Sequence, residues 1–352
     1  MARFRLFSCI RSTKEHSSYS QRRDDYDQAE FPFISDANVR VFEPTEPIVS
    51  TDTFAPSRVI GEGRLGRVYK GILQDGQEVA VKRFHAQADL WVEVRMLRRV
   101  DHSNLIKMIG YCDKGEDHII VYDFMPLQSL NLHLQDLQPG KKPLDWKTRM
   151  KIAEGVAKAL EYLHDQKDPP VIYGGLSRTC ILLDESYNPK LSDFSCAKDG
   201  PVGDYTLMYM KMLETYGYVD PEICMTGHLT LKSDVYSFGV LLLELISGEK
   251  AFEYNIRGSG MHTITAWAQP LIDSKEFQEI VDPLIEGQYP YLGLVQALGL
   301  AKMCVQYEAH ERPRMAEVMT TLSNLVSQTY EEVQGIQPKA DPCCVVHKQL
   351  DR

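Results

Sequence analysis

Residues 61–68 read Gly-Glu-Gly-Arg-Leu-Gly-Arg-Val and lie between two short β-like runs, Val59-Ile60 and Val68-Tyr69-Lys70. Because glycine has no Cβ, a backbone built from Gly61, Gly63 and Gly66 can close over phosphate groups and donate N–H groups to them. A tight hairpin uses glycines as well, so the motif alone does not decide between the two. A strand follows the motif, whereas a dinucleotide-binding fold requires a helix there.

A lysine and a glutamate follow the glycine motif at informative positions. Val79-Ala80-Val81-Lys82 places Lys82 at the end of another β-like run, and Glu93 lies in the next helical segment. Lys82 by itself reads as a solvated strand lysine. The glycine motif favours the other interpretation, in which its ammonium group pairs with the α- and β-phosphates of a nucleotide and is held by Glu93. Together these residues predict a nucleotide cradle.

Along the rest of the chain the predicted secondary structure changes once, from mostly strands to mostly helices. Short β-like runs fill residues 58 to about 124 and are interrupted by one helical segment near 88–100. Beyond them, apolar residues recur at three- and four-residue steps over 150–164, and a second helix runs from Ser233 to Ser247 and ends at Gly248. A small strand-rich half followed by a larger helical half predicts an α+β, two-lobed fold.

The ends of the chain have a different composition. Residues 1–52 are polar and irregular, which predicts a flexible basic and polar arm, and residues 329–352 read as a flexible tail. The domain between them is expected at 53–328, with a smaller lobe at 53–124 and a larger one at 125–328.

Composition excludes several classes of protein. The formal net charge of −10 argues against general nucleic-acid binding, which needs a basic face. No run approaches the roughly 20 apolar residues that span a bilayer. The eight cysteines form no C-x-x-C pair, so neither a zinc site nor a disulfide framework is expected. A reducing, cytoplasmic compartment fits best.

Several ordered motifs carry a resemblance to a known family. They are Ile60-Gly-Glu-Gly, Val121-Tyr-Asp-Phe-Met-Pro-Leu, Pro189-Lys-Leu-Ser-Asp-Phe, Thr215-Tyr-Gly-Tyr and Lys232-Ser-Asp-Val-Tyr-Ser-Phe-Gly. Over roughly Thr53 to Asn324 the chain resembles a plant receptor-like cytoplasmic kinase of the receptor-like kinase/Pelle family. The resemblance implies a protein-kinase fold and ATP as cofactor. It also implies an adenine site made by the gatekeeper Tyr122, the hinge residues Asp123 and Met125, and the apolar side chains of Val68, Ala80 and Leu182.

The catalytic loop departs from that family. Where the family reads Y-R-D-L-K, two residues, N-I-L-L-D, this chain reads Tyr173-Gly-Gly-Leu-Ser-Arg-Thr-Cys-Ile-Leu-Leu-Asp184, without a gap. By the resemblance, Gly174 stands in place of the arginine that grips a phosphorylated loop, and Gly175 in place of the aspartate that accepts the substrate proton. Ser177 stands in place of the lysine that steadies the γ-phosphate, and Cys180 in place of a magnesium-binding asparagine.

These four departures remove distinct chemical roles. A glycine cannot accept a proton, a serine hydroxyl supplies no cation, and a cysteine sulfur is a poor ligand for hard Mg²⁺. Loss of positioned acid–base catalysis alone costs about 10²- to 10⁴-fold in rate. The sequence therefore predicts a pseudokinase, with no intact catalytic residue.

Other family positions are kept. Asp193 remains as a ligand for a single Mg²⁺ or Mn²⁺, which predicts weak or altered metal dependence, while Ser195 replaces the glycine of that turn. Asp234 is expected to anchor the catalytic loop, and Arg312 to be the buried partner of Glu222. Four residues of the activation segment are candidate phosphorylation sites, with ordinary exposed loop residues as the alternative: Tyr205, Thr206, Tyr209 and Thr215.

Two interpretations of the arm stay open. Cys9 lies among basic and apolar residues, so palmitoylation there, with the basic patch, predicts reversible contact with the inner face of the plasma membrane. The alternative is a plain disordered arm. Met1-Ala2 lacks the glycine needed for myristoylation. Cys343 and Cys344 are further acylation candidates.

Three functions compete at this stage. The first is a pseudokinase that acts as adaptor, scaffold or decoy in plant signalling, with immune relevance implied by the resemblance. Its partners would be active receptor kinases, related cytoplasmic kinases or immune receptors. The second is a weak or atypical serine/threonine kinase, and the third is a nucleotide-gated switch.

Overall fold

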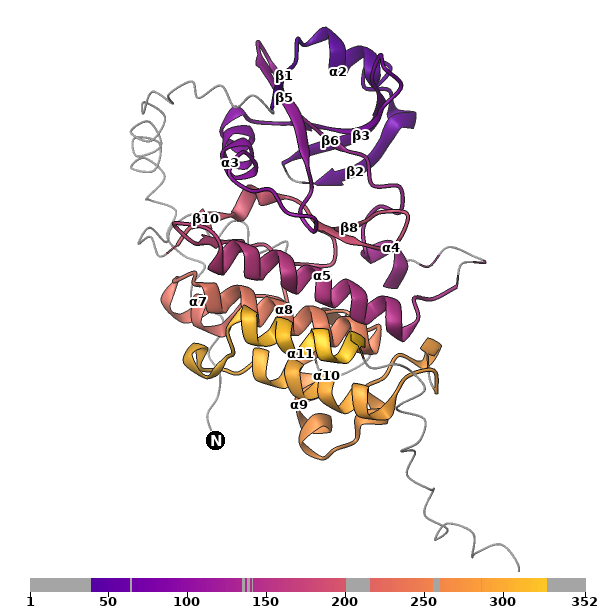
Figure 1. Ribbon diagram of the computed structural model, residues 1–352, viewed down its shortest axis with the longest axis vertical. Helices are drawn as coiled ribbons and strands as arrows, with labels where there is room; N and C mark the ends of the chain where they lie inside the picture. Colours follow the sequence, from indigo (N-terminus) through magenta and orange to yellow (C-terminus); the bar gives the residue numbers. More distant parts are fainter. Residues whose placement is uncertain are drawn as a thin grey trace, which may run out of the picture. The chain divides into compact units, whose positions relative to one another are not determined.

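The structure, a computed structural model, describes residues 39–327 except 64, 135–136, 138–139, 141, 201–215, 256–259 and 286. Figure 1 shows a strand-rich lobe followed along the chain by a mostly helical lobe, as the sequence predicted. The N-terminal lobe contains β1 (Arg40–Val41), α2 (Thr45–Ser50), the 3₁₀ turn η1 (Pro56–Arg58), β2 (Val59–Gly63), β3 (Gly66–Ile72), β4 (Glu78–Phe84), α3 (Gln87–Leu97), β5 (Met108–Lys114) and β6 (Asp117–Asp123).

The larger lobe carries the remaining helices and several two-stranded pairs. Its elements up to the activation segment are α4 (Asn131–Leu134), α5 (Trp146–Asp165), β7 (Val171–Ile172), β8 (Ile181–Leu183), β9 (Pro189–Leu191), η2 (Phe194–Cys196) and β10 (Lys198–Asp199). Those beyond it are α7 (Pro221–Thr226), α8 (Leu231–Ser247), β11 (Phe252–Asn255), β12 (Gly260–Thr263), α9 (Ile264–Asp273), η3 (Phe277–Glu279), η4 (Pro283–Ile285), α10 (Tyr291–Cys304), η5 (Ala309–Glu311) and α11 (Met315–Ser327).

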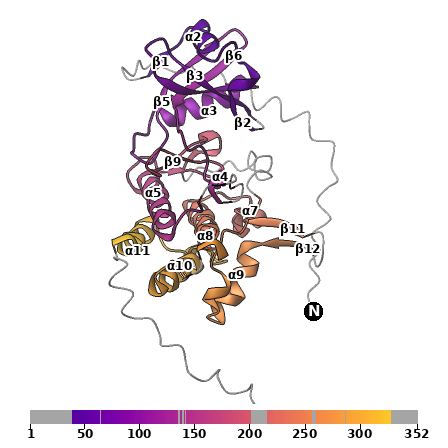
Figure 2. The ribbon, with the colours of Figure 1, turned by 90° about the vertical axis from the view of Figure 1, so that its right-hand side faces the viewer.

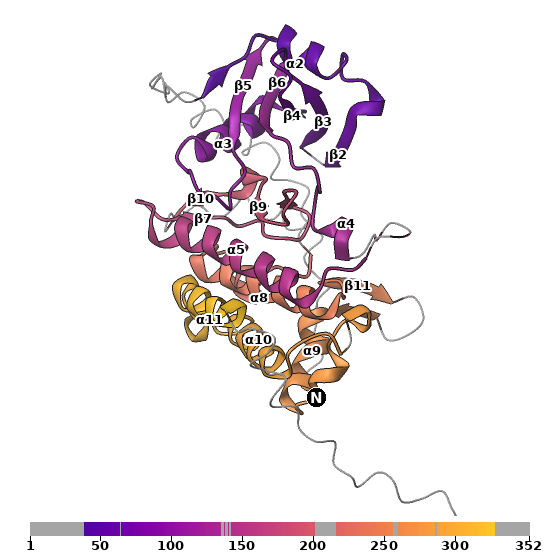
Figure 3. The same ribbon diagram turned by 45° about the vertical axis from the view of Figure 1, so that its right-hand side comes forward.

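The N-terminal lobe is built on one sheet with strand order β1-β5-β6-β4-β3-β2. Alternation along β4 sends Val79 and Val81 to one face and Ala80 to the other, because successive strand side chains point to opposite faces. α3 packs on the face that carries Ala80, and Figure 3 shows this helix against the sheet. This helix lies close to the predicted segment 88–100 but starts one residue earlier and ends at Leu97.

The expected arm boundary at residue 52 is wrong. Residues from Val39 are already part of the folded unit, since β1 pairs in parallel with β5 and Phe42 is fully buried under the sheet's outer face. α2 adds Pro47 and Ser50 to the buried residues. The polar composition of this stretch concealed it, because only two or three apolar side chains carry the packing.

α5 and α8 form the core of the larger lobe. α5 starts at the N-cap Asp145, whose carboxylate accepts a 2.8 Å hydrogen bond from the Thr148 backbone N–H. α8 is apolar around most of its circumference and is buried along nearly its whole length, as expected for a central helix. It ends where predicted, at Gly248, whose φ of 71° is the left-handed conformation that favours glycine.

No helix among the residues described is both long and apolar enough to cross a membrane.

Candidate nucleotide site and catalytic loop

The predicted cradle residues meet in the structure. The Lys82 ammonium lies 2.7 Å from Glu93 Oε2 and 3.3 Å from Asp193 Oδ1. Lys82 comes from β4, Glu93 from α3, and Asp193 from the turn before η2, so three elements converge on one charge. Only 1% of the Glu93 side chain is exposed, against 45% for Asp193. The lysine is therefore held by a buried carboxylate, Glu93, and by a partly exposed one, Asp193.

Electrostatics keep Lys82 charged in this position. Burial alone lowers the pKa of a lysine, but the adjacent Glu93 and Asp193 carboxylates more than offset that effect and raise the pKa of Lys82 above its ordinary value. The ammonium group is therefore fully protonated at neutral pH and available to an anionic phosphate.

Tyr122 takes part in the same cluster, which the sequence did not reveal. Its hydroxyl donates a 2.8 Å hydrogen bond to Glu93 Oε1, so both carboxylate oxygens of Glu93 are occupied. Burial, together with the nearby Glu93 charge, raises the pKa of Tyr122 well above its ordinary value. This tyrosine stays neutral and acts as a fixed donor that orients Glu93 toward Lys82.

The residues expected around adenine belong to one apolar cluster. Ala80 and Tyr122 are buried and lie opposite each other on β4 and β6, while Val68, Met125 and Leu182 pack against the same cluster with part of their surface exposed. Asp123 ends β6 and donates its backbone N–H to the Lys107 carbonyl at 3.1 Å.

The glycines of the motif have different surroundings. A Cβ on Gly66 would lie 2.0 Å from the Arg83 carbonyl oxygen, so the pairing of β3 with β4 itself requires a glycine there. A Cβ on Gly63 would meet nothing within 4 Å, and one on Gly61 only Val68 at ordinary contact distance. Open space at Gly63 would admit a close approach of phosphates, whereas Gly61 lies in ordinary contact with Val68 and Gly66 is required by strand pairing.

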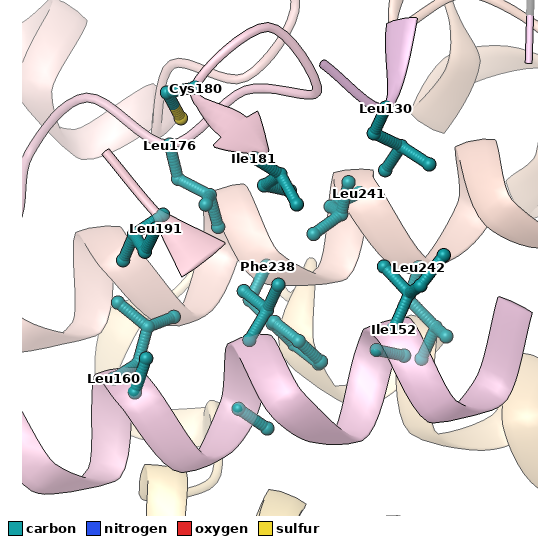
Figure 4. Close-up of a cluster of buried hydrophobic side chains, with 14 of the residues drawn as sticks. Leu130, Ile152, Leu160, Leu176, Cys180, Ile181, Leu191, Phe238, Leu241 and Leu242 are labelled. Carbon is teal, nitrogen blue, oxygen red and sulfur yellow. The ribbon is translucent and has the colours of Figure 1, made fainter. Parts of the chain in front are cut away.

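Asp234 anchors the catalytic loop as predicted. Its Oδ2 accepts the Tyr173 backbone N–H at 2.8 Å and contacts His164 Nε2 at 2.9 Å, and its Oδ1 accepts the Gly174 backbone N–H at 2.7 Å. Phe194 packs edge-on against Tyr173, with ring centroids 5.4 Å apart. Figure 4 shows Leu176 and Ile181 pointing from this loop toward Phe238 and Leu241 of α8, so the loop is firmly seated on the core.

Gly174 and Gly175 are closely packed although they carry no side chains. Gly174 has a φ of 70°, and a Cβ there would lie 2.9 Å from Leu229 Cδ2. A Cβ on Gly175 would lie 3.2 Å from Cys196 Cβ and 3.3 Å from its Sγ. Cys196 therefore borders the place where the resemblance puts the proton-accepting aspartate, a neighbour that the sequence alone did not identify.

Ser177 and Cys180 form hydrogen bonds within the loop. The Ser177 hydroxyl lies 2.7 Å from the Thr179 hydroxyl, and the Cys180 thiol donates to the Ser177 carbonyl at 2.9 Å. Burial raises the pKa of Cys180 to about 11, so the sulfur remains a neutral thiol at physiological pH.

Alkylation tests whether the Cys180 thiol is buried. In the native protein at pH 8 we expect iodoacetamide to modify the exposed Cys224 well before Cys180, as read by peptide mass spectrometry. Because the pKa of Cys180 is raised from 9.0 to about 11, the stability linked to its protonation is complete below pH 9 and is lost as the pH rises toward 11. Equal labelling of both thiols at pH 8 would contradict the assigned burial.

Asp193 is the residue of this site that fits a divalent metal ion. Mg²⁺ and Mn²⁺ prefer oxygen ligands, and Asp193 supplies an accessible carboxylate. The Cys180 sulfur is a soft atom and therefore a poor ligand for hard Mg²⁺. The part of the chain that is described contains no group of three or more His, Cys, Asp or Glu side chains able to hold a metal. Asp193 would therefore hold such an ion, whose charge would offset that of bound phosphate groups.

The prediction that Arg312 is the buried partner of Glu222 is wrong. Both guanidinium NH groups of Arg312 donate to Asp220, at 2.6 and 2.7 Å, and both side chains are fully buried. Asp220 also caps α7 by accepting the Glu222 backbone N–H at 2.9 Å. Asp220 stands where the resemblance expects an alanine, and its shorter side chain sits deeper than Glu222, which is partly exposed. That sequence departure was the available signal.

A second buried network, missed by sequence reasoning, joins the catalytic loop to the segment after residue 215. Arg178 Nη1 donates to Glu244 Oε1 at 2.8 Å, the Tyr218 hydroxyl donates to Glu244 Oε2, and the Arg178 backbone N–H donates to the Tyr218 hydroxyl at 3.1 Å. Burial is the main cause that raises the pKa of Glu244. Arg178 and Glu244 carry no motif signal, because they are some 66 residues apart and meet only in the fold.

The candidate modification sites lie outside the described residues. They are Cys9, Tyr205, Thr206, Tyr209, Thr215, Cys343 and Cys344.

Over most of its length the chain is similar in sequence to known protein kinases. Residues 54–322 match the family described as protein tyrosine and serine/threonine kinase. Among curated proteins of Arabidopsis thaliana, the chain is 51% identical over 299 residues to serine/threonine-protein kinase PBL27, covering 83% of this chain and 58% of that protein. It is 50% identical over 299 residues to probable serine/threonine-protein kinase PBL7, covering 83% and 79%. It is 49% identical over 293 residues to serine/threonine-protein kinase PBS1, covering 81% and 64%. The match thus spans less than two thirds of PBL27 and of PBS1.

Proposed function

The chain belongs to the protein tyrosine and serine/threonine kinase family, and from this premise we propose that it is a nucleotide-binding pseudokinase. In this proposal the domain binds ATP in the cradle of Lys82, Glu93 and Asp193 but transfers phosphate poorly or not at all. It acts as an adaptor, scaffold or decoy for active receptor kinases, related cytoplasmic kinases or immune receptors in plant signalling.

The proposal rests on the contrast between the charged residues around Lys82 and the residues of the catalytic loop. The Lys82–Glu93 pair is formed at 2.7 Å, with Asp193 beside it, which supports nucleotide binding. At the catalytic loop, Gly175 has no side chain to take a proton, and the Cys180 sulfur is an uncharged, buried thiol. In-line phosphoryl transfer depends on positioning and charge stabilisation, and these are the functions that the loop lacks.

Peripheral contact with the inner face of the plasma membrane through Cys9 belongs to the same proposal. Acylation at that residue, together with the neighbouring basic side chains, would provide two weak attachment signals.

A weak or atypical serine/threonine kinase is the second candidate, and specific observations favour it. The formed Lys82–Glu93 pair supports it, and the similar proteins PBL27 and PBS1 are named serine/threonine-protein kinases. Transfer of labelled phosphate to a protein substrate, lost on Lys82→Met, would support this candidate over the first.

Thermal unfolding of the full chain tests nucleotide binding. At ATP about 100-fold above its Kd the native state gains about 2.7 kcal/mol, so we expect the unfolding midpoint to rise by several degrees. Lys82→Met removes the cation from the phosphate site and should abolish the rise, whereas Lys302→Met, on the surface of α10, should keep it. Comparing Mg²⁺, Mn²⁺ and EDTA shows whether the single expected metal ion contributes. No midpoint change at saturating ATP would reject the nucleotide cradle.

A further inference from the structure

Residues 39–58, here called the strap, cover the outer face of the N-terminal sheet. Phe42 is fully buried against a cluster that includes Val81 and Val121, and Phe54 packs on Tyr69 with ring centroids 5.1 Å apart. These side chains lie on the opposite face of the sheet from α3. Figure 2 shows α2 and α3 on the two sides of the sheet. The strap therefore supplies the second layer that shields an apolar sheet face from water.

The strap is fastened to β5 through backbone pairing that leaves no spare room. Arg40 and Val41 pair with Gly110 and Tyr111, and the Phe42 backbone N–H donates to the Tyr111 carbonyl at 2.8 Å. A Cβ on Gly110 would lie 2.0 Å from the Arg40 carbonyl oxygen and 2.7 Å from Phe42 Cε2. Only glycine at position 110 admits the strap in this place.

β5 in turn holds α3. The Tyr111 ring packs edge-on against Trp91 at 5.4 Å, and the Asp113 carboxylate accepts hydrogen bonds from Trp91 Nε1 at 2.9 Å and Gln87 Nε2 at 2.8 Å. Tyr111 is thus shared, since its backbone pairs with the strap and its ring contacts α3. These contacts grip the first turns of α3, two residues before Glu93.

α3 needs such support for a physical reason. It has 11 residues, and its N-cap, Ala86, makes no side-chain hydrogen bond to the free N–H groups of the first turn. Helices of this length are marginal in water without tertiary packing. The place of Glu93 therefore depends on what anchors the start of the helix.

We propose that the strap is a positioning device for the cradle: it fixes β5, β5 fixes α3 through Trp91 and Asp113, and α3 presents Glu93 to Lys82. A factor that displaces the strap loosens α3 and weakens the cradle. The positioning of α3 by the strap does not depend on the proposed function. Only the expected effect on ATP affinity rests on that function.

Hydrogen exchange of the full chain, read by mass spectrometry without nucleotide, tests the structural step. Gly110→Ala should speed exchange in β1, β5 and α3 by about tenfold or more, and leave α5 and α8 unchanged. Gly299→Ala in α10, where a Cβ meets nothing within 4 Å, is the matched control and should leave exchange in β1, β5 and α3 as in the wild type. Faster exchange in β1 with α3 unchanged would overturn the proposal.

A milder variant keeps the test decisive if Gly110→Ala unfolds the chain. Phe42→Leu retains an apolar side chain in the same cluster. Its effect on the hydrogen-exchange rate of α3 is compared with its effect on that of α5. Equal acceleration in both helices would then count against the proposal.

The ATP-induced rise in unfolding midpoint completes the experiment. It should be smaller in Gly110→Ala than in Gly299→Ala, and an equal rise would refute the link from strap to cradle. If the wild-type chain shows no rise at all, nucleotide binding is rejected, while the exchange data still decide whether the strap positions α3.

Discussion

Restoring three catalytic-loop side chains is expected to raise phosphate transfer by at least about 10²-fold, the lower bound of a positioned proton acceptor alone. The variant is Gly175→Asp, Ser177→Lys and Cys180→Asn, which returns a proton acceptor, a cation and a hard oxygen ligand to the loop. The rest of the site is already in place, because Lys82, Glu93 and Asp193 lie together and Asp234 holds the loop backbone. Transfer of radiolabelled phosphate from ATP to a generic protein substrate measures the gain.

The structure also sets the design of that variant. A side chain at position 175 must displace Cys196 by only a few tenths of an ångström, since the contacts would be 3.2 and 3.3 Å. Position 174 is left as glycine, because its φ of 70° and the 2.9 Å approach to Leu229 disfavour any side chain. The same triple change combined with Lys82→Met should be inactive. Wild-type transfer already at the level of the triple variant would overturn the pseudokinase proposal.

Loss of the Arg312 guanidinium is expected to cost roughly 3–5 kcal/mol of stability, because it leaves the Asp220 carboxylate buried and unpaired. Arg312 also donates hydrogen bonds to the carbonyl oxygens of Gln306, Tyr307 and Lys232. The substitution Arg312→Met therefore leaves these acceptors without this donor as well. Urea unfolding of the full chain measures the change. Arg314→Met, an exposed neighbour, should stay within about 0.5 kcal/mol of the wild type.

A double variant identifies the partner of Arg312. Adding Asp220→Ala to Arg312→Met removes the stranded charge and should recover part of the lost stability, whereas adding Glu222→Ala should recover none. Recovery with Glu222→Ala instead would show that Glu222, and not Asp220, is the buried partner.

Local sequence signals predicted much of this molecule correctly. Helical periodicity located α5 and α8, and Gly248 marked the end of α8, because both signals arise within a single helix. The pairing of Lys82 with Glu93 was also predicted, since both residues stand in recognisable local contexts, and nucleotide binding by this pair stays a prediction. β5 was missed: its residues 108–114 alternate poorly between apolar and polar, and glycine and charged residues interrupt the pattern.

Sequence alone determined the two-lobed α+β fold, the place of Lys82 and Glu93 in consecutive elements, and the residue types at Gly174, Gly175, Ser177 and Cys180. Which distant groups meet was decided only by the tertiary structure. The pairing of Arg312 with Asp220, the bond from Tyr122 to Glu93 and the strap over the sheet each join residues from different elements. Their physical reason is burial: a charge or an apolar ring removed from water must find its partner in three dimensions, and spacing along the chain does not encode that distance.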